Sequence, residues 1–450
     1  MIRTTPPLLA TLLTALTGCA AGVAAPASEP PAWQNIQINA VSTTKIGAGV
    51  AATTSMRPDG TLQTVALDLT SGRKLWAHPA TMVGRLPGMG VQPPAVVPDQ
   101  GAADRGLVAA LEPPRQKGSS VALVGRDART GRQRWSRPMR STFGPQRCDG
   151  YLCVSENTSL ATAQVVVLDP ATGRQMWKLP GIAEVEWSGA GKVVLLRLAD
   201  HPVLEAHDLK TGRTIWRQPV ERALGAGVDL SGGWAFGATS TDLIGYIAPY
   251  SDGKTGTTSA FGMFSVRLGD GTVNWMRPSV VRVYPSGSPG VAPVVRPVDK
   301  EGQYGGFALL DAASGRVVGQ ITSGQVPGTG WWLAFPGKPT TLGFLKRGRA
   351  GAVFDLTTGQ AAPVKGERGW SFCRTDPKPL KLPHISPPGF YSVASLCEFD
   401  LANGERIADA GVPPVWFTGS QNGWRLWRDD RGGLHAVKDG TATTPSMYGA

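Results

Sequence analysis

Short apolar runs alternate with polar turns along most of this chain, and one such unit recurs at a fixed spacing. The apolar run 165–168 leads to Asp169, Gly173 and Trp177, which follow one another at intervals of four residues. An apolar run of strand length, a turn rich in polar residues and a second short run together predict a β-hairpin. Three further copies keep both intervals: Asp68, Gly72 and Trp76; Asp127, Gly131 and Trp135; and Asp208, Gly212 and Trp216.

The residue types of the unit explain the turn. An Asp at the end of a strand can accept a hydrogen bond from the backbone N–H two residues on, and Gly supplies the positive φ that closes the turn. The run before the Asp is then the incoming strand, and the run after the Gly is the outgoing strand. A Trp at one fixed place on every outgoing strand predicts a repeated pocket. The gap between neighbouring copies is the natural pocket, because a large aromatic side chain buries roughly 150–250 Å².

Weaker copies continue toward the C-terminus. Asp127, Asp169 and Asp208 are separated by 42 and 39 residues, and a period of roughly 40–45 residues is typical of a four-stranded propeller blade. The alternative at this period is an array of helical repeats, which the 58 Gly and 37 Pro residues disfavour. The weaker copies are Asp270, Gly271 and Trp275, with Asp next to Gly, and the hairpins beginning at Asp311, Asp355, Asp400 and Asp439.

The sequence therefore predicts an all-β fold, a β-propeller of about eight four-stranded blades over residues 38–450. The hairpins number one more than eight blades need, so we assign one of them to an insertion or to the closure of the ring; seven blades is the alternative. Two gaps between copies, Asp68 to Asp127 and Asp208 to Gly271, are longer than the period. We expect insertions in each, at Gly84 to Ser119 and at Ile244 to Phe264.

The first residues are typical of an export signal. A positive charge at Arg3 precedes a short apolar run, and Leu16-Thr17-Gly18-Cys19 resembles the lipobox of bacterial lipoproteins. The resemblance implies a signal peptide over residues 1–18 and a lipid on Cys19; an ordinary cleaved signal is the alternative. Residues 19–37, rich in Ala and Pro, are predicted to be an extended tether. We therefore expect a lipid-anchored protein on the extracytoplasmic side of the cell membrane.

The repeat resembles that of the pyrroloquinoline-quinone-like propellers, which include quinoprotein dehydrogenases and a lipoprotein of the outer-membrane barrel-assembly machinery. The resemblance covers nearly all of the mature chain and implies that Trp-bearing strands dock blade on blade. In the quinoprotein enzymes it also implies adjacent cysteines, a calcium ion and an Asp base. No Cys-Cys pair occurs in this chain, and its acidic residues are mostly turn Asp residues. We predict no catalytic, cofactor-binding or metal-binding residue.

Four cysteines follow Cys19, and an exported chain is in a compartment that permits disulfides. Asp149-Gly150 between Cys148 and Cys153 is a hairpin signal that can bring the two Cα atoms close enough for a bridge. Cys373 and Cys397 flank a Pro-rich stretch. We predict a disulfide in each pair; metal binding is the alternative for Cys148 and Cys153.

The chain is basic, with a net charge of +12 and a pI near 9.7. A basic exported protein is attracted to anionic lipid headgroups or wall polymers, whereas nucleic acid is not an expected partner outside the cell. An equally acceptable interpretation is a solvated surface with Arg at the turns.

Two functions from different classes are compatible with these features. The first is a monomeric, non-catalytic binding or scaffold module for protein or cell-envelope partners. The second is a redox enzyme or sensor that binds a quinone or another small ligand. The motif itself specifies the scaffold and says little about activity.

Overall fold

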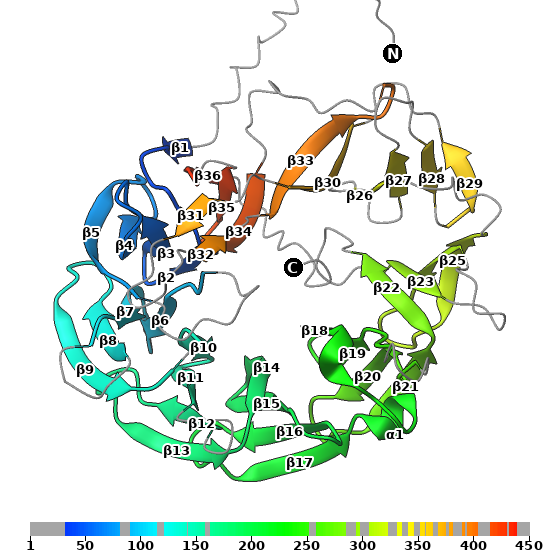
Figure 1. The fold of residues 1–450 in the computed structure, drawn as a ribbon, viewed down its shortest axis with the longest axis horizontal. Helices are drawn as coiled ribbons and strands as arrows, with labels where there is room; N and C mark the ends of the chain where they lie inside the picture. Colours follow the sequence, from blue (N-terminus) through cyan, green and yellow to red (C-terminus); the bar gives the residue numbers. More distant parts are fainter. Residues whose placement is uncertain are drawn as a thin grey trace, which may run out of the picture.

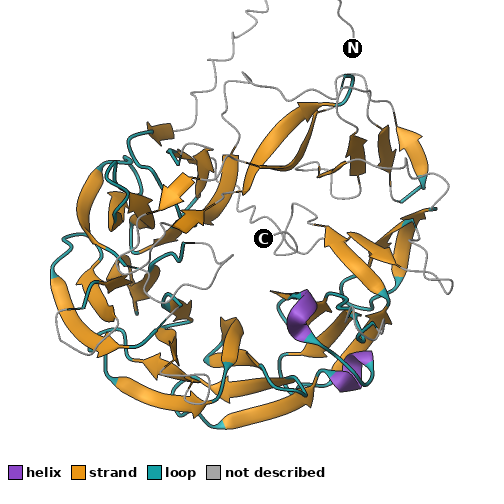
Figure 2. Ribbon diagram, viewed as in Figure 1, coloured by secondary structure: helices purple, strands orange, loops and turns teal. Residues whose placement is uncertain are grey.

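Antiparallel sheets follow one another around a ring in the computed structural model, which confirms the predicted all-β propeller fold (Figure 1). Figure 2 shows that strands make up nearly all of the regular structure, with only short helical turns. The structure describes residues 32–81, 91–114, 121–141, 143–157, 163–251, 258–284, 294–297, 306–322, 331–334, 341–345, 352–355, 357–362, 368–374, 378–380, 389–391, 394–403, 415–429 and 432–438.

The first six sheets each contain four consecutive strands, with the first strand at the centre of the ring and the fourth on its perimeter (Figure 1). In chain order they are β2 (Lys45–Gly47), β3 (Val50–Met56), β4 (Leu62–Asp68) and β5 (Lys74–Pro79); β6 (Ala95–Asp99), β7 (Ala102–Glu112), β8 (Val121–Asp127) and β9 (Gln133–Met139); β10 (Gln146–Cys148), β11 (Tyr151–Asn157), β12 (Ala163–Leu168) and β13 (Gln175–Pro180); β14 (Ala183–Gly189), β15 (Lys192–Arg197), β16 (Val203–Asp208) and β17 (Thr214–Pro219); β18 (Trp234–Ala238), β19 (Asp242–Ile247), β20 (Gly262–Arg267) and β21 (Val273–Pro278); and β22 (Val280–Tyr284), β23 (Val294–Pro297), β24 (Phe307–Leu310) and β25 (Val317–Ile321). One turn of α-helix, α1 (Glu221–Leu224), and a 3₁₀ turn, η2 (Leu230–Gly232), connect the fourth and fifth sheets.

The remaining strands complete the ring less regularly. They are β26 (Trp331–Ala334), β27 (Thr341–Leu345), β28 (Ala352–Asp355), β29 (Gln360–Ala362), β30 (Arg368–Arg374), β31 (Lys378–Leu380), β32 (Gly389–Tyr391), β33 (Ala394–Asp400), β34 (Val415–Gln421), β35 (Trp424–Asp429) and β36 (Leu434–Lys438). One six-stranded sheet joins the four strands β26 to β29 to the pair β30 and β33, while β31 and β32 form a separate two-stranded sheet. Because one sheet combines two groups of strands, the number of blades stays a prediction.

The N-terminal strand closes the ring. β1 (Ala32–Asn35) pairs antiparallel with β36, so the first described strand is the outer strand of a sheet whose other three strands are the last described ones. The tether predicted for residues 19–37 therefore extends too far, because residues 32–35 belong to a sheet. Asp439, the start of the last predicted hairpin, lies outside the described residues.

The two segments predicted as insertions also contain regular strands of the sheets. The segment from Gly84 to Ser119 contains β6 and β7, which are the two inner strands of the second sheet. The segment from Ile244 to Phe264 contains the end of β19 and the start of β20. The extra length lies in connections between strands, at 80–94, 113–120, 220–233 and 248–261. All of these except 220–233, which carries α1 and η2, overlap the predicted segments. Gly and Pro frequency therefore located long connections but did not exclude the strands between them.

The core lies between successive sheets. Middle strands such as β15 are continuous apolar runs, and its residues 193–196 are all fully buried because a neighbouring sheet covers each face. One buried cluster contains Val165 and Val167 of the third sheet together with Val193 and Leu195 of the fourth. Burial of each such side chain stabilises the fold by roughly 1.5–3 kcal/mol.

Each Asp turn is held by its own carboxylate. Asp208 accepts hydrogen bonds from the backbone N–H groups of Lys210 at 3.1 Å and Thr211 at 2.7 Å, and from the Thr211 hydroxyl at 2.7 Å. The Gly212 N–H donates to the Asp208 carbonyl at 2.8 Å, with Gly212 at a φ of 74°. Both features are those expected from the Asp-to-Gly spacing.

Each Trp then docks on the turn of the next sheet. The Trp177 Nε1–H donates to the Leu209 carbonyl at 2.8 Å, and a Cβ added at Gly212 would lie 2.7 Å from Trp177 Cγ. The turn therefore needs Gly for close approach as well as for its positive φ. The same contact joins six Trp residues to the next turn: Trp33 to Leu69, Trp76 to Ala128, Trp135 to Pro170, Trp177 to Leu209, Trp216 to Leu268 and Trp275 to Ala312.

Replacing Trp177 by Ala should lower the free energy of unfolding by about 3–5 kcal/mol, because it removes an aromatic ring packed between two sheets. The neighbouring Met176, 40% exposed on the same strand, is the matched control and should tolerate Ala with a change under about 0.5 kcal/mol. Urea unfolding followed by Trp fluorescence measures both. A Trp177→Ala protein as stable as the control would show that the docked ring does not hold the sheets together.

Candidate functional site

The Asp residues of the repeat form hydrogen bonds and ion pairs that hold the fold together. The Asp68 carboxylate accepts hydrogen bonds from Thr70 and Ser71 in its own turn and from Arg129 of the next sheet at 2.8 Å. Burial opposes ionisation of Asp68, but these hydrogen bonds outweigh it and hold its pKa well below the usual range. The pKa of Asp127 is lowered to about 2 in the same way, with Arg134 as its charged partner. These carboxylates stay ionised and paired at neutral pH, as structural groups do.

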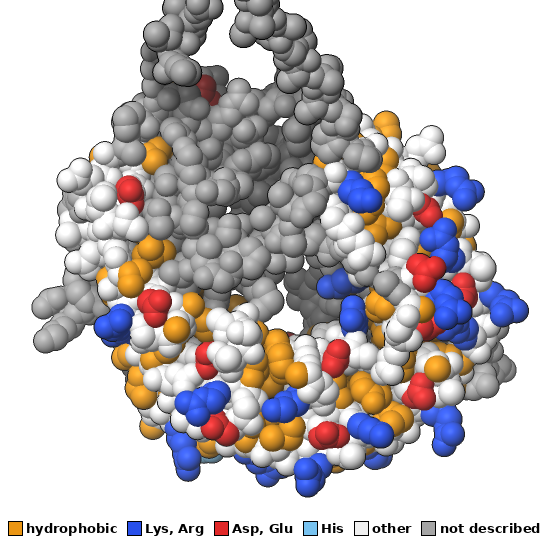
Figure 3. Space-filling model, turned by 180° about the vertical axis from the view of Figure 1, so that it is seen from behind, with side chains coloured by type: hydrophobic (Ala, Val, Ile, Leu, Met, Phe, Trp, Pro, Cys, Tyr) orange, Lys and Arg blue, Asp and Glu red, His pale blue; other side chains and the backbone are white. Residues whose placement is uncertain are grey.

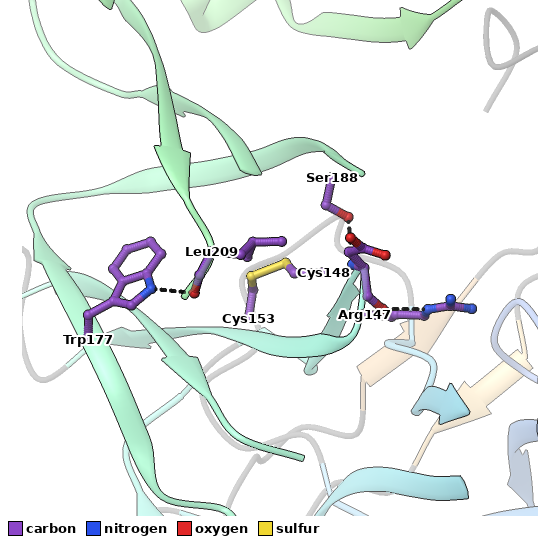
Figure 4. The surroundings of a disulfide bond; sticks show 7 residues. Arg147, Cys148, Cys153, Trp177, Ser188 and Leu209 are labelled. Atoms are coloured by element: carbon purple, nitrogen blue, oxygen red, sulfur yellow. Dashed lines mark hydrogen bonds between the residues drawn. A yellow bond between two sulfur atoms is a disulfide. The ribbon is translucent and has the colours of Figure 1, made fainter. Parts of the chain in front are cut away.

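A disulfide joins Cys148 and Cys153, as predicted from the hairpin signal between them (Figure 4). Their Cα atoms lie 5.8 Å apart, and Asp149 in the intervening turn has a φ of 53°. Both cysteines are fully buried in the cluster between the third and fourth sheets. The alternative of metal binding by this pair is wrong.

The turn inside the disulfide also contacts the next sheet. The Asp149 N–H donates to Ser188 Oγ at 3.0 Å (Figure 4). The Asp149 carboxylate accepts from the Gly191 N–H at 3.0 Å. The Arg147 guanidinium donates to the Asp149 carbonyl at 2.8 Å. The disulfide therefore fixes a turn that joins two sheets near the centre of the ring.

The other predicted cysteines are not tested by the geometry. Cys19 lies outside the described residues. The backbones of Cys373 and Cys397 lie on the paired strands β30 and β33, where Cys373 is opposite Ser395 and Cys397 is opposite Ser371. The two cysteines are thus two positions apart in register, and their disulfide stays a prediction.

A group that the sequence analysis missed lies on the inner edge of the ring. The register between β14 and β15 shifts between Val185 and Trp187, so Glu186 is the extra residue of a β-bulge. Its carboxylate accepts a hydrogen bond from the Trp234 indole at 2.8 Å, across to the inner strand of the next sheet. Glu184 lies on the same strand. We call Glu184, Glu186 and Trp234 the inner-edge group.

The inner-edge group differs electrostatically from the turn carboxylates. Burial raises the pKa of Glu186 to about 7, helped by the nearby Glu184 and opposed by the Trp234 hydrogen bond. Burial also raises the pKa of Glu184. A carboxyl group that titrates near neutral pH can exchange protons or bind a cation, so these are the described residues best suited to chemistry. No sequence signal marks them, because a bulge depends on the register of the partner strand.

A second carboxylate shows the contrasting, fully paired arrangement. Glu205 is buried and contacts Arg197 at 3.1 Å, His207 at 3.1 Å and Arg217 at 3.3 Å. Burial alone would raise its pKa, but hydrogen bonds from His207 and Arg197 and the charges of the two arginines lower it to about 2. Glu205 is therefore a fixed anion inside the fourth sheet.

Two other properties can be stated for the described part of the chain. Its helices are too short and polar for any of them to pass through a lipid bilayer. Its His, Cys, Asp and Glu side chains nowhere gather in threes at distances suited to a shared metal ion.

Comparison with known proteins leaves the family open. No protein-family model and no curated protein matches this chain. Among solved structures, BamB from Moraxella catarrhalis is 11% identical, with a TM-score of 0.45 over 92% of this chain and 99% of that one. A quinohemoprotein alcohol dehydrogenase from Comamonas testosteroni is 12% identical, with a TM-score of 0.38 over 92% and 77%. The identification of the fold rests on the strand topology and not on these distant similarities.

The raised pKa of Glu186 predicts a loss of stability with rising pH. The folded state holds a proton up to about pH 7, whereas the unfolded chain loses it near pH 4.3, so stability falls as the pH rises through this window. Glu186→Gln should remove the Glu186 part of this dependence and leave the part due to Glu184, whose pKa burial also raises. The variant should unfold like the unmodified protein at pH 5 and be more stable by roughly 1–3 kcal/mol at pH 8. Urea unfolding at a series of pH values measures it.

The matched control is Trp234→Phe, which removes the indole N–H that favours the charged form. It should raise the Glu186 pKa further and move the loss of stability to higher pH. Equal pH profiles for the unmodified protein and Glu186→Gln would contradict the assignment.

The disulfides predict a defined labelling pattern. Alkylation of the denatured protein without reductant should leave Cys148, Cys153, Cys373 and Cys397 unmodified, and reduction should make all four reactive. Cys148→Ser with Cys153→Ser should lower stability by about 2 kcal/mol, because it opens a short loop closed in the unfolded chain. Peptide mass mapping reads each pair separately, so labelling of Cys373 and Cys397 alone would refute only the second bridge.

Proposed function

We propose that this protein is a lipid-anchored, extracytoplasmic propeller that serves as a binding or scaffold module for protein or cell-envelope partners. The observation that carries the proposal is that the Asp carboxylate, the Gly and the Trp indole of each repeat are all used to hold one sheet to the next. The lipobox-like residues 16–19 support export and anchoring. The alternative of a quinone-binding enzyme has less support, since the chain contains no adjacent cysteine pair.

We assign the partner-binding face from the position of the longer connections. In an antiparallel four-stranded sheet, the first and third turns lie at one end and the second turn and outgoing connection at the other. The short turns share one end, as the hydrogen bond from Leu209 N–H to the Gly191 carbonyl at 2.8 Å illustrates. The longer connections, such as 220–233 and 248–261, lie at the opposite end, which we call the loop face. Long connections are where binding residues are free to vary.

Photo-crosslinking in the producing cells tests this proposal. A photoreactive phenylalanine at Tyr250, which is 38% exposed on a long connection of the loop face, should give discrete partner adducts. The same group at Met276, 50% exposed on the outer strand β21, is the control and should give far fewer. Equal patterns at the two positions would argue against a partner on the loop face.

Titration calorimetry with pyrroloquinoline quinone and Ca²⁺ tests the alternative function. We expect no saturable heat, because we assign no residue to either ligand. Tight saturable binding would overturn the non-catalytic proposal. Radiolabelled palmitate incorporation that is lost in Cys19→Ala would support the anchor independently.

A further inference from the structure

The outer strands of the first six sheets are rich in Arg and Lys. We define the outer stretches as residues 73–79, 132–139, 174–180, 213–219, 272–278 and 316–321, each running from the residue after a turn Gly to the end of an outer strand. They contain no Asp or Glu. Their cations are Arg73, Lys74, Arg132, Arg134, Arg137, Arg174, Lys178, Arg213, Arg217, Arg277 and Arg316.

The positive charge is not spread evenly over the strands. The whole chain has 45 Lys and Arg against 33 Asp and Glu, a net charge of +12, so the cations of the outer stretches account for nearly all of the excess. The inner strands of the same six sheets are mixed, with Lys45, Arg147 and Arg282 alongside Asp99, Glu184 and Glu186. In Figure 3 many blue side chains stand on the outer perimeter over the described sheets.

Most of these cations lack a carboxylate partner among the described residues. Arg134, Arg137 and Arg217 form ion pairs, with Asp127, Glu156 and Glu205. The other outer cations form no ion pair within the described ranges. Nearly all of them are exposed to solvent. The exposed ones are therefore available to an external anion, whereas the half-buried Arg277 donates to the Gly315 carbonyl.

Five of the arginines occupy one equivalent position, directly after the turn Gly. The backbone of that residue serves the turn: the Asp208 N–H, for example, donates to the Arg213 carbonyl at 2.9 Å. The side chain adds a contact at Arg316, whose Nε donates to the Ser314 hydroxyl at 3.3 Å. The turn at Gly271 forms with Thr272 at this position, so the fold does not require a cation there. The result is an array of guanidinium groups in five of the first six sheets, at Arg73, Arg132, Arg174, Arg213 and Arg316.

The outer strands are poorly suited to adding a protein strand. Five of them carry a Pro three residues after the Trp, at Pro79, Pro138, Pro180, Pro219 and Pro278. Proline and charged side chains on an edge strand block further backbone pairing. The perimeter is thus suited to bind a charged ligand and is poorly suited to a protein partner that pairs through its backbone.

We propose that the perimeter binds a flexible polyanion, a chain of phosphate or carboxylate groups that follows the ring across several sheets. Arg recognises both groups through paired N–H donors. A flat anionic bilayer could touch only one side of the ring, whereas a flexible chain can reach successive sheets and gain from multivalency. The inference rests on the proposed function and names a class of envelope partner for it.

Fluorescence anisotropy with labelled inorganic polyphosphate tests the proposal on the full mature chain. A long chain should bind at least about tenfold more tightly per phosphate than tripolyphosphate, because it bridges several sheets. Affinity should fall steeply as salt is added, since binding releases counterions. Poly-glutamate in place of polyphosphate distinguishes a carboxylate source from a phosphate source.

Charge-matched variants locate the site. R73Q/R132Q/R174Q/R213Q should weaken long-chain binding about tenfold or more and flatten its salt dependence. R57Q/R105Q/R140Q/R222Q removes the same charge from exposed positions outside the outer stretches and should change affinity less than about threefold. Circular dichroism and urea unfolding check that both variants fold.

Three outcomes would overturn the proposal. Equal losses in the two variants would mean that net charge alone attracts the polymer. If long and short chains bind with equal affinity per phosphate, each phosphate is bound independently and no chain bridges several sheets. Vesicles containing anionic lipid that bind more tightly than polyphosphate, and lose binding in the first variant, would identify a membrane surface instead. Crosslinks at Tyr250 are independent of all three, so they report separately on the scaffold function.

Discussion

The structure depends on one contact, the indole of each outer strand against the glycine turn of the next sheet. The Asp carboxylate holds the turn and thereby aims the carbonyl of the following residue at the incoming Nε1–H. Gly has two roles, because its positive φ closes the turn and its missing side chain admits the ring. A change at any of the three residues therefore disturbs both the hairpin and its junction with the neighbouring sheet.

Much of this arrangement could be predicted from sequence because the contact is local at its origin. Asp208 and Gly212 lie in one turn. Trp216 follows at a fixed spacing on the strand that leaves this turn, and it contacts the turn of the next sheet. Trp33 makes the same contact with Leu69 and was missed, since its partner strand β36 lies at the other end of the chain and no Asp-Gly turn precedes it. Strand pairing between the two ends leaves no local pattern.

The inner-edge group was unpredictable for a related reason. Glu186 is distinctive only because β14 bulges against β15 at that residue, which places its carboxylate beside the Trp234 indole of another sheet. Glu205 has an equally ordinary sequence context, yet it becomes a paired anion because Arg197 and His207 reach it. Opposite pKa changes in two glutamates thus follow from neighbours supplied by tertiary structure, which the periodic pattern does not encode.

The same geometry separates positions that the fold fixes from positions that it leaves free. At the residue after each turn Gly, the turn uses the backbone and does not require one particular side chain, as Thr272 and Gln360 show by occupying this position within intact turns. Arg nevertheless occupies it in five of the first six sheets. Hydrogen bonds within the turns lower the pKa of Asp208 and Asp311, and the charges of Arg213 and Arg316 help to lower it. Because the guanidinium groups are exposed and the turn forms without them, they can also serve the interaction with an external anion that we propose.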